Sequence, residues 1–142
     1  MAEPQNRYVV EQYWDAHFRR DWVRMATFFT DDAHYTDVGA DGSGATGPRE
    51  IIARLRIGIE PLEGYYHWPK HMIADGDFVV TEHVEEWRFH TGEVIQHPFT
   101  SVMEVRNGLI ERWHDYSNLP NLTQRAPKWW LEHIANGWRH LL

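Results

Sequence analysis

Three consecutive β-strand patterns between residues 78 and 118 decide the fold of this chain. The first reads FVVTEHVEEWRF over residues 78–89, and the third reads LIERWHDYSN over residues 109–118. The first is rich in β-branched and aromatic residues, which favour strands. Glycine-containing turn sequences separate the three patterns, so the sequence predicts consecutive antiparallel strands joined by hairpins.

Side chains alternate between the two faces of a strand, and this alternation predicts which residues share a site. His83, Glu85 and Trp87 fall on one face of the first strand. Asp115 falls on one face of the third strand, so a second carboxylate can meet the first from a neighbouring strand. If the two faces were exchanged, the inner face would instead carry Glu82, Glu86 and Arg88. A charged row of this kind is typical of a solvent-exposed face, so we do not favour this alternative.

The chain before these strands begins with helices. Apolar residues recur at three- and four-residue spacing over residues 8–20, which is typical of an amphipathic helix. Asp21 is a candidate N-cap for a second, shorter helix that ends near residues 30–32. A short strand over residues 33–38 follows, and its alternation puts Tyr35 and Asp37 on one face.

Glycine and proline divide the middle of the chain. Residues 39–47 contain four glycines but lack the Lys-Ser/Thr ending of a phosphate loop, so we expect a flexible connection. Pro48 begins a third helix that ends before Pro61. Residues 65–74 predict an edge or bulged strand, because Pro69 cannot donate to a sheet ladder.

This order predicts an α+β fold: a cone-shaped domain of a curved antiparallel sheet, with N-terminal helices packed on its concave face. The length suits one core, so we expect a single domain over residues 1–142. Within it, residues 120–142 form a C-terminal helical tail. Its last helix, residues 128–135, should cover one end of the pocket or a partner subunit.

Composition and charge disfavour several classes of function. The net charge is −7 and the basic residues are scattered, which disfavours nucleic acid and anionic membranes as partners. The absence of cysteine excludes disulfides, thiol nucleophiles and thiolate metal sites. The N-terminus lacks the apolar run of a signal peptide, and no stretch approaches the roughly 20 apolar residues of a membrane span, so we expect a cytoplasmic protein.

Three short segments carry a resemblance to a known superfamily. They read TDDAHYTD over residues 30–37, TEHVE over residues 81–85 and WHDY over residues 113–116. With the helix-first order, they resemble the nuclear-transport-factor-2-like superfamily up to about residue 119. This superfamily includes ketosteroid isomerase, scytalone dehydratase, the SnoaL-like polyketide cyclases and limonene-1,2-epoxide hydrolase. The segments are most similar to the last of these.

The resemblance to limonene-1,2-epoxide hydrolase implies a hydrolase and a role for five residues. Asp115 matches the general base that acts on water, and Tyr35 and Asp37 match the residues that hold this water. Glu85 matches the acid that protonates the epoxide oxygen, and His83 matches a bridging arginine. At positions 37, 83 and 85 the family has Asn, Arg and Asp instead.

The residues themselves are consistent with this chemistry. One-step epoxide hydrolysis needs a base and an acid whose pKa values are pushed apart, and Asp115 and Glu85 can supply them. With Asp37, three carboxyls would face one apolar cavity, where like charges cannot all ionise. We therefore expect at least one to stay protonated near neutral pH. The residues expected to bind a small hydrophobic substrate are Trp87, His97, Phe99, Met103 and Trp113.

Two other functions stay open. Tyr35, His83 and His97 resemble the set of a scytalone-dehydratase-like enzyme, and Asp37 matches the position of the general base in ketosteroid isomerase, so a dehydratase or isomerase is an alternative. A non-catalytic binding protein is another, because fold alone does not determine function. We expect no cofactor. We also expect no metal, although one set of side chains could ligate one: His83, Glu85, His97 and Asp115.

The outer face of the sheet predicts a homodimer. Val80, Val84 and Val102 point away from the helices, on a protein that is otherwise acidic. An exposed apolar face of this kind is typical of a contact between two copies of a chain.

Overall fold

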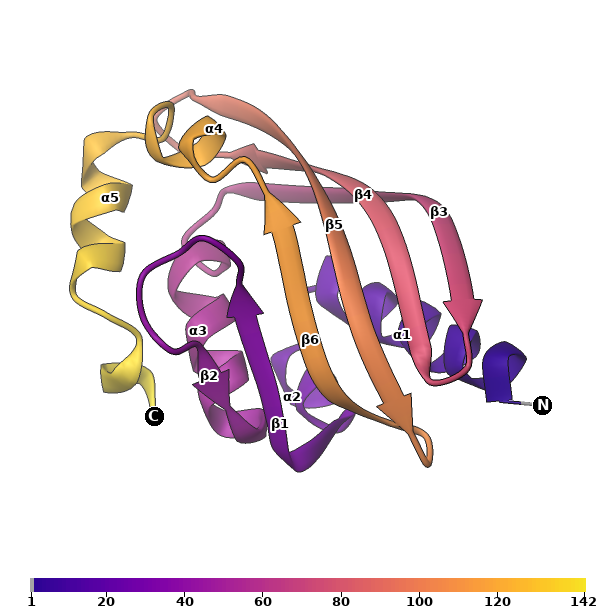
Figure 1. The fold of residues 1–142 in the computed structure, drawn as a ribbon. Coiled ribbons are helices and arrows are strands. Elements are labelled where there is room, and N and C mark those ends of the chain that lie inside the picture. The colour runs from indigo at the N-terminus through magenta and orange to yellow at the C-terminus, as the bar shows by residue number, and fades with distance from the viewer. Residues whose placement is uncertain (1) are drawn as a thin grey trace.

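A curved six-stranded sheet forms one wall of the molecule, and helices cover its concave face (Figure 1). The computed structural model describes residues 2–142. The strand order is β2-β1-β6-β5-β4-β3. The strands are β1 (Phe29–Asp37), β2 (Ala45–Thr46), β3 (Gly64–Asp75), β4 (Phe78–Arg88), β5 (Val94–Arg106) and β6 (Leu109–Ser117).

The strands β3 to β6 pair in sequence order and form the predicted antiparallel meander. Strand β3 is an edge strand whose register shifts between Pro69 and His71, as the proline predicted. Strand β1 runs parallel to β6, with Asp37 in register with Asp115. The sheet is therefore mixed rather than wholly antiparallel. This parallel pairing brings together two acidic residues that are far apart in the sequence.

The helices are α1 (Ala2–Phe18), α2 (Trp22–Ala26), α3 (Gly47–Ile59), α4 (Pro120–Thr123), α5 (Lys128–Ala135) and the 3₁₀ helix η1 (Arg139–Leu141). The α+β class and the helix-first order are confirmed, and α5 has the predicted bounds. The prediction that the second helix continues to residues 30–32 is wrong, because strand β1 already begins at Phe29. Pairing with β6 takes these residues into the sheet. The single-domain boundary over residues 1–142 stays a prediction.

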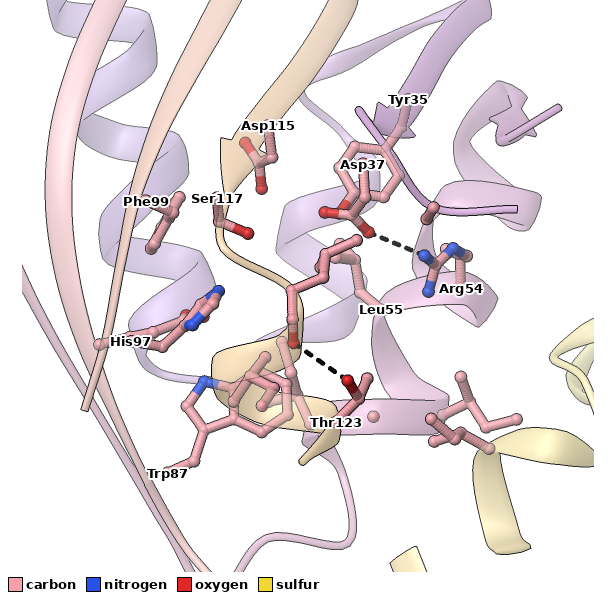
Figure 2. Close-up of a pocket in the computed structure, with 18 of the residues that line it drawn as sticks. Tyr35, Asp37, Arg54, Leu55, Trp87, His97, Phe99, Asp115, Ser117 and Thr123 are labelled. Atoms are coloured by element: carbon pink, nitrogen blue, oxygen red, sulfur yellow. Dashed lines mark hydrogen bonds and ion pairs between the residues drawn. The ribbon is translucent and has the colours of Figure 1, made fainter. Parts of the chain in front are cut away.

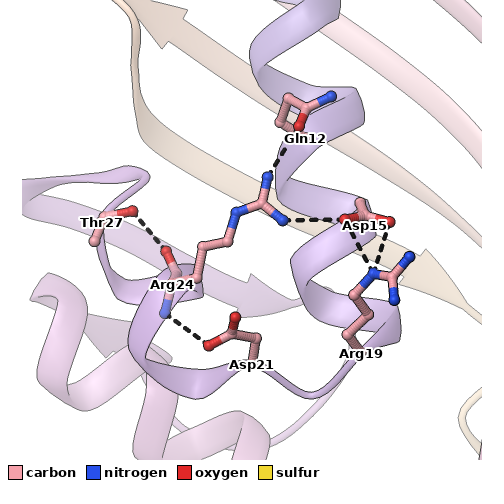
Figure 3. A network of polar contacts seen from close by, with 6 residues as sticks. All are labelled: Gln12, Asp15, Arg19, Asp21, Arg24 and Thr27. Atoms are coloured by element: carbon pink, nitrogen blue, oxygen red, sulfur yellow. Dashed lines mark hydrogen bonds and ion pairs between the residues drawn. The ribbon is translucent and has the colours of Figure 1, made fainter.

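Polar contacts hold α2 against the end of α1 (Figure 3). Asp21 caps α2 as predicted, since its side chain accepts from the backbone N–H of Arg24. The Arg24 guanidinium donates to Asp15 at 3.0 Å and to Gln12 at 2.9 Å, and Thr27 donates to the Arg24 carbonyl. Exposed ion pairs of this kind contribute about 0–1 kcal/mol each, so they orient α2 more than they stabilise it.

The glycine-rich connection after β1 folds back onto that strand. Its end forms β2, which pairs with β1 at His34 and Tyr35. Gly44 has a positive φ of 81°, and a Cβ there would clash with the Tyr35 carbonyl. Only glycine lets the two backbones approach this closely. The connection therefore has a structural role beside the strand that carries Tyr35 and Asp37.

Two apolar clusters fill the concave side of the sheet. The first lies under α1 and includes Tyr13, Trp14 and Trp113. The second lies toward the C-terminal helices and includes Trp87 and Trp130. No helix within residues 2–142 is long and apolar enough to cross a membrane.

Candidate active site

A cavity of about 380 Å³ lies on the concave side of the sheet, between the strands, α3 and the C-terminal helices (Figure 2). Its polar lining residues are His17, Tyr35, Asp37, Asp41, Arg54, Glu85, His97, Asp115, Ser117 and Thr123. Large apolar side chains form the rest of the wall, among them Leu55, Trp87 and Phe99. Trp130 and Ile134 of α5 also line it, so the tail covers part of the cavity as expected.

The structure brings together most of the residues that the sequence singled out. Tyr35, Asp37, Glu85 and Asp115 all line the cavity, as do three of the expected substrate-binding residues: Trp87, His97 and Phe99. In Figure 2, Asp37 and Asp115 point into the space from the β1 and β6 side, and His97 and Trp87 point into it from the opposite wall.

Three predicted residues do not line this cavity. His83 is 0% exposed; its ring stacks on Phe99 with centroids 4.5 Å apart, and the tilted ring of Trp14 lies 4.3 Å away. Met103 and Trp113 are also buried in the core rather than facing the cavity. Their positions on the inner face were predicted correctly, but α1 covers this part of the face. Strand alternation assigns a side chain to a face and does not show how far a helix extends over it.

Arg54 holds one of the three carboxyls. Its Nη2 donates to Asp37 Oδ2 at 2.7 Å, and both side chains are partly buried. Burial raises the pKa of Asp37, and the Arg54 guanidinium opposes this rise because it stabilises the carboxylate. Sequence analysis did not identify Arg54. The available signal was its place on the third helix, three residues after the buried Ile51 and therefore on nearly the same side.

Asp115 forms no ion pair with any of the residues 2–142, and its partners are neutral donors. Its Oδ1 accepts from Trp113 Nε1 at 2.5 Å and from the Ser101 hydroxyl. Burial raises the pKa of Asp115 well above its ordinary value, the nearby Asp37 raises it further, and the two hydrogen bonds oppose both effects. Since both donors use Oδ1, Oδ2 is left to hold a proton. Burial therefore favours the protonated form of Asp115 strongly, whereas the Arg54 guanidinium favours the ionised form of Asp37.

Glu85 is the third carboxyl, and its partner is a phenol. Tyr65, on the neighbouring strand β3, donates to Glu85 Oε2 at 2.5 Å. Burial raises the pKa of Glu85 to about 7, against the opposing effects of the Tyr65 hydroxyl and of the nearby Trp87 N–H. The side chain thus exchanges its proton near neutral pH, as a general acid requires. Ser101 and Tyr65 were both missed, although the inward parity of position 101 beside Met103 was a signal for the first.

His83 belongs to a separate group of buried histidines. Its Nδ1 lies 2.7 Å from His67 Nε2, and His17 Nδ1 lies 3.1 Å from the Tyr13 hydroxyl. Burial lowers the pKa of His67 to about 4 and that of His83 to about 2, so both rings are neutral at pH 7. His83 therefore cannot act as a cation between the carboxyls, which is the role that the resemblance implied for it.

The side chains of this site do not form a metal centre. Within residues 2–142, no three His, Asp or Glu side chains converge so that they could hold a metal ion. The chemistry available to the described residues is proton transfer between carboxyls of different pKa, in a cavity with apolar walls.

The fold is shared with many solved structures. One is an LEH-like epoxide hydrolase of M. tuberculosis, 22% identical, with a TM-score of 0.75 over 95% of this chain and 96% of that chain. Another is TerC, co-crystallised with polyporic acid, 18% identical, with a TM-score of 0.76 over 85% and 97%. A third is a nuclear-transport-factor-2-like protein of unknown function from Burkholderia pseudomallei, 20% identical, with a TM-score of 0.76 over 85% and 96%.

Identities this low establish the fold and leave the reaction open. No curated protein sequence matches this chain significantly. A family model does match it, and the match extends over residues 10–113, from the first helix to the strand that carries Asp115. The chain therefore belongs to the SnoaL-like domain family, within the nuclear-transport-factor-2-like fold.

Proposed function

We propose that this protein is an enzyme that adds water to a small hydrophobic epoxide in one step, by general acid and general base catalysis. The observation that carries the proposal is that three carboxyls, one buried and two partly buried, meet one cavity in three different environments. Asp37 accepts from the Arg54 guanidinium, and Asp115 accepts from neutral donors at one oxygen. Glu85 accepts from the Tyr65 hydroxyl. Different environments push pKa values apart, which separates the base from the acid.

The pair of Asp37 and Asp115 acts as the base. It holds a single negative charge, so it can take one proton from a water molecule that lies between the two strands. The water oxygen attacks an epoxide carbon and the carbon–oxygen bond of the ring breaks. The electron pair of that bond stays on the leaving oxygen, which takes the proton of Glu85. A proton then passes from the pair back to Glu85 through solvent, and the diol leaves.

The walls of the cavity support a hydrophobic substrate. Trp87 and Phe99 line one side, and Leu55 of α3 lines another (Figure 2). A volume of about 380 Å³ lies in the range of small-molecule sites. One of the solved structures with the same fold is described as an epoxide hydrolase, so the fold is compatible with this reaction.

The test is a labelling experiment in oxygen-18 water with a panel of terpene and cycloalkene epoxides. The proposal predicts diols that carry one labelled oxygen, and it predicts no labelled diol when Asp37 and Asp115 are both replaced by Asn. If the wild-type protein hydrolyses none of the epoxides, the proposal is wrong.

One observation favours a second candidate, a dehydratase or isomerase. Arg54 donates to Asp37 at the edge of the cavity and favours its ionised form, and an Asp37 carboxylate could take a proton from a carbon next to a carbonyl. Protonated Glu85 would then donate to the carbonyl oxygen. β-Hydroxy ketones and β,γ-unsaturated ketones in the same panel test this candidate, and conversion to enones in place of diol formation would establish it. If neither product forms, a binding role remains.

We also propose that the protein forms a homodimer through the outer face of the sheet. Val84 and Val102 are half-buried there, and Trp68 and Tyr116 are exposed on the same face. Sedimentation at micromolar concentration should show a dimer that Val84→Arg converts to a monomer. Val23→Arg, an equal change at an exposed site on α2, is the control and should leave the dimer intact. A wild-type monomer would contradict the proposal.

A further inference from the structure

Asn121 in α4 has a side-chain amide whose orientation is fixed by its partners. Its Nδ2 donates to the Gln96 carbonyl at 2.9 Å, and its Oδ1 accepts from Arg125 Nη1 at 2.9 Å. A carbonyl can only accept and a guanidinium can only donate, so exchanging the amide nitrogen and oxygen would break both bonds. The nitrogen therefore also faces His97, whose Nδ1 lies 3.1 Å away.

This contact determines the tautomer of His97. Because Asn121 Nδ2 can only donate, His97 Nδ1 accepts and carries no proton. A neutral imidazole with a bare Nδ1 has its proton on Nε2. Burial lowers the pKa of His97 to about 4, so the ring is neutral at pH 7. His97 thus presents an uncharged Nε2–H group, and it lines the cavity (Figure 2).

A second N–H group reaches the same wall. Trp87 Nε1 is buried and makes no hydrogen bond of good geometry among residues 2–142, although it lies near enough to Glu85 to lower the pKa of that carboxyl. Trp87 pairs with Ile95 and Glu85 pairs with His97, so Trp87 and His97 are diagonal neighbours on the inner face of β4 and β5. The side-chain hydrogen bond of His97 within the described residues uses Nδ1, which leaves Nε2 available to a ligand. A buried donor without an acceptor is unfavourable, and a ligand oxygen placed here would satisfy it.

We propose that His97 and Trp87 form a subsite that binds a carbonyl or ether oxygen of a neutral hydrophobic ligand. Asn121 is the positioning residue: it keeps His97 Nε2 a donor, so the subsite binds hydrogen-bond acceptors. This inference deepens the proposed function and rests on it only in taking this cavity as the substrate site. It adds that the substrate carries an acceptor oxygen apart from the one that Glu85 protonates. A purely hydrocarbon ligand would leave both N–H groups unpaired.

The test measures binding without turnover, using three ligands of similar shape. They are 2-acetylnaphthalene with an acceptor, 1-(2-naphthyl)ethanol with a hydroxyl, and 2-ethylnaphthalene with neither. The wild-type protein should bind the ketone about tenfold more tightly than the hydrocarbon, which is the size of effect that one or two neutral hydrogen bonds produce. His97→Phe should lose most of this preference, because it removes one donor and keeps an aromatic ring.

Asn121→Asp tests the positioning role. A carboxylate accepts from His97 Nδ1, which moves the proton from Nε2 and turns Nε2 into an acceptor. At about pH 8.5, where a histidine beside a carboxylate is neutral, this variant should bind the alcohol more tightly than the ketone. Asn118→Asp is the control, because it adds the same charge three residues away on an exposed side chain and should keep the wild-type order.

Nitrogen-15 NMR of the histidine rings gives a readout that needs no ligand. The His97 signals, identified by their absence in His97→Phe, should show the Nε2–H tautomer in the wild-type protein and the Nδ1–H tautomer in Asn121→Asp. An Nδ1–H tautomer in the wild type would overturn the inference, as would equal ketone and hydrocarbon affinities. Ketone selectivity without epoxide hydrolysis would refute only the proposed reaction, and hydrolysis without selectivity would refute only the subsite.

Discussion

Two groups of buried titratable side chains lie on the same concave face, and they differ in what surrounds them. The carboxyl cluster, Asp37, Glu85 and Asp115, lines the cavity and has polar partners. The histidine cluster, His17, His67 and His83, lies mostly under α1 among aromatic rings. The contrast shows most clearly on β4, where position 83 is 0% exposed and position 85, two residues on, opens into the cavity.

The difference teaches that burial alone does not make a catalytic group. Burial pushes both clusters toward their neutral forms, so it raises the pKa of Glu85 and lowers the pKa of His83. The carboxyls combine a shifted pKa with access to the cavity, whereas His67 and His83 have shifted pKa values but do not line it. The histidines are held neutral and shielded, which suits packing. Changing one cluster at a time tests this difference.

The largest effect is expected for the base. Asp37→Asn and Asp115→Asn together should lower turnover by about 10²- to 10⁴-fold, the usual contribution of positioned proton transfer. Each single substitution should lower turnover less than the double substitution does. The remaining carboxyl then has no like-charged neighbour, so it can ionise and act as the base. Steady-state kinetics on the best epoxide measures this. Asp41→Asn, at the same cavity, is the control. A single variant as inactive as the double would assign the base to that residue alone.

Replacing the acid should have the next largest effect. Glu85→Gln removes the proton that the leaving oxygen takes, and turnover should fall by about 10²-fold, the lower end for such a group. In the wild-type protein kcat/KM should decline above about pH 7, because Glu85 then loses its proton. Glu86→Gln, next along the strand and paired with Arg88, should leave the rate unchanged. A pH profile that is the same in Glu85→Gln and the wild type would exclude Glu85 as the acid.

The two clusters should have opposite effects on how the free energy of unfolding changes with pH. The pKa of Glu85 is raised from 4.5 to about 7, so its contribution to stability is lost as pH rises through this range. The pKa of His83 is lowered from 6.5 to about 2, so its contribution is present above pH 6.5 and is lost as pH falls. The wild-type protein should therefore show a shallow pH dependence between pH 4.5 and 6.5.

Removing a histidine should expose the carboxyl contribution. In His83→Phe, the slope of unfolding free energy against pH between pH 4.5 and 6.5 should fall by up to about 1.4 kcal/mol per pH unit, which corresponds to one proton. Urea unfolding at several pH values measures this slope. His71→Phe, at an exposed position on the neighbouring strand, should keep the wild-type slope. Equal slopes in the wild type and His83→Phe would show that His83 titrates normally.

The smallest effect concerns the hydrogen bond between Tyr65 and Glu85. This bond lowers the pKa of Glu85, so Tyr65→Phe should raise it and move the alkaline limb of the pH profile to higher pH. The measurement is kcat/KM against pH, with Tyr66→Phe on the outer face of the same strand as the control. A limb that moves to lower pH, or does not move, would contradict the proposed hydrogen bond.

Much of the fold could be predicted from the sequence because it depends on local signals. The turn residues after β3, β4 and β5 determine hairpins, Pro69 identifies an edge strand, and alternation assigns faces. These rules act over a few residues. Alternation correctly assigned Glu85 and Asp115 to one face of the sheet. The register of β5 with its neighbours places both residues around one cavity.

The tertiary structure decided what covers each position and what each carboxyl contacts. The extent of α1 over the sheet places His83 and Trp113 in the core, and no local pattern contains that information. The contact of Arg54 with Asp37 spans 17 residues and that of Asn121 with His97 spans 24. Such contacts depend on how whole elements pack. The residue types of the site were therefore determined by the sequence, whereas their charges and tautomers were set by packing between distant segments.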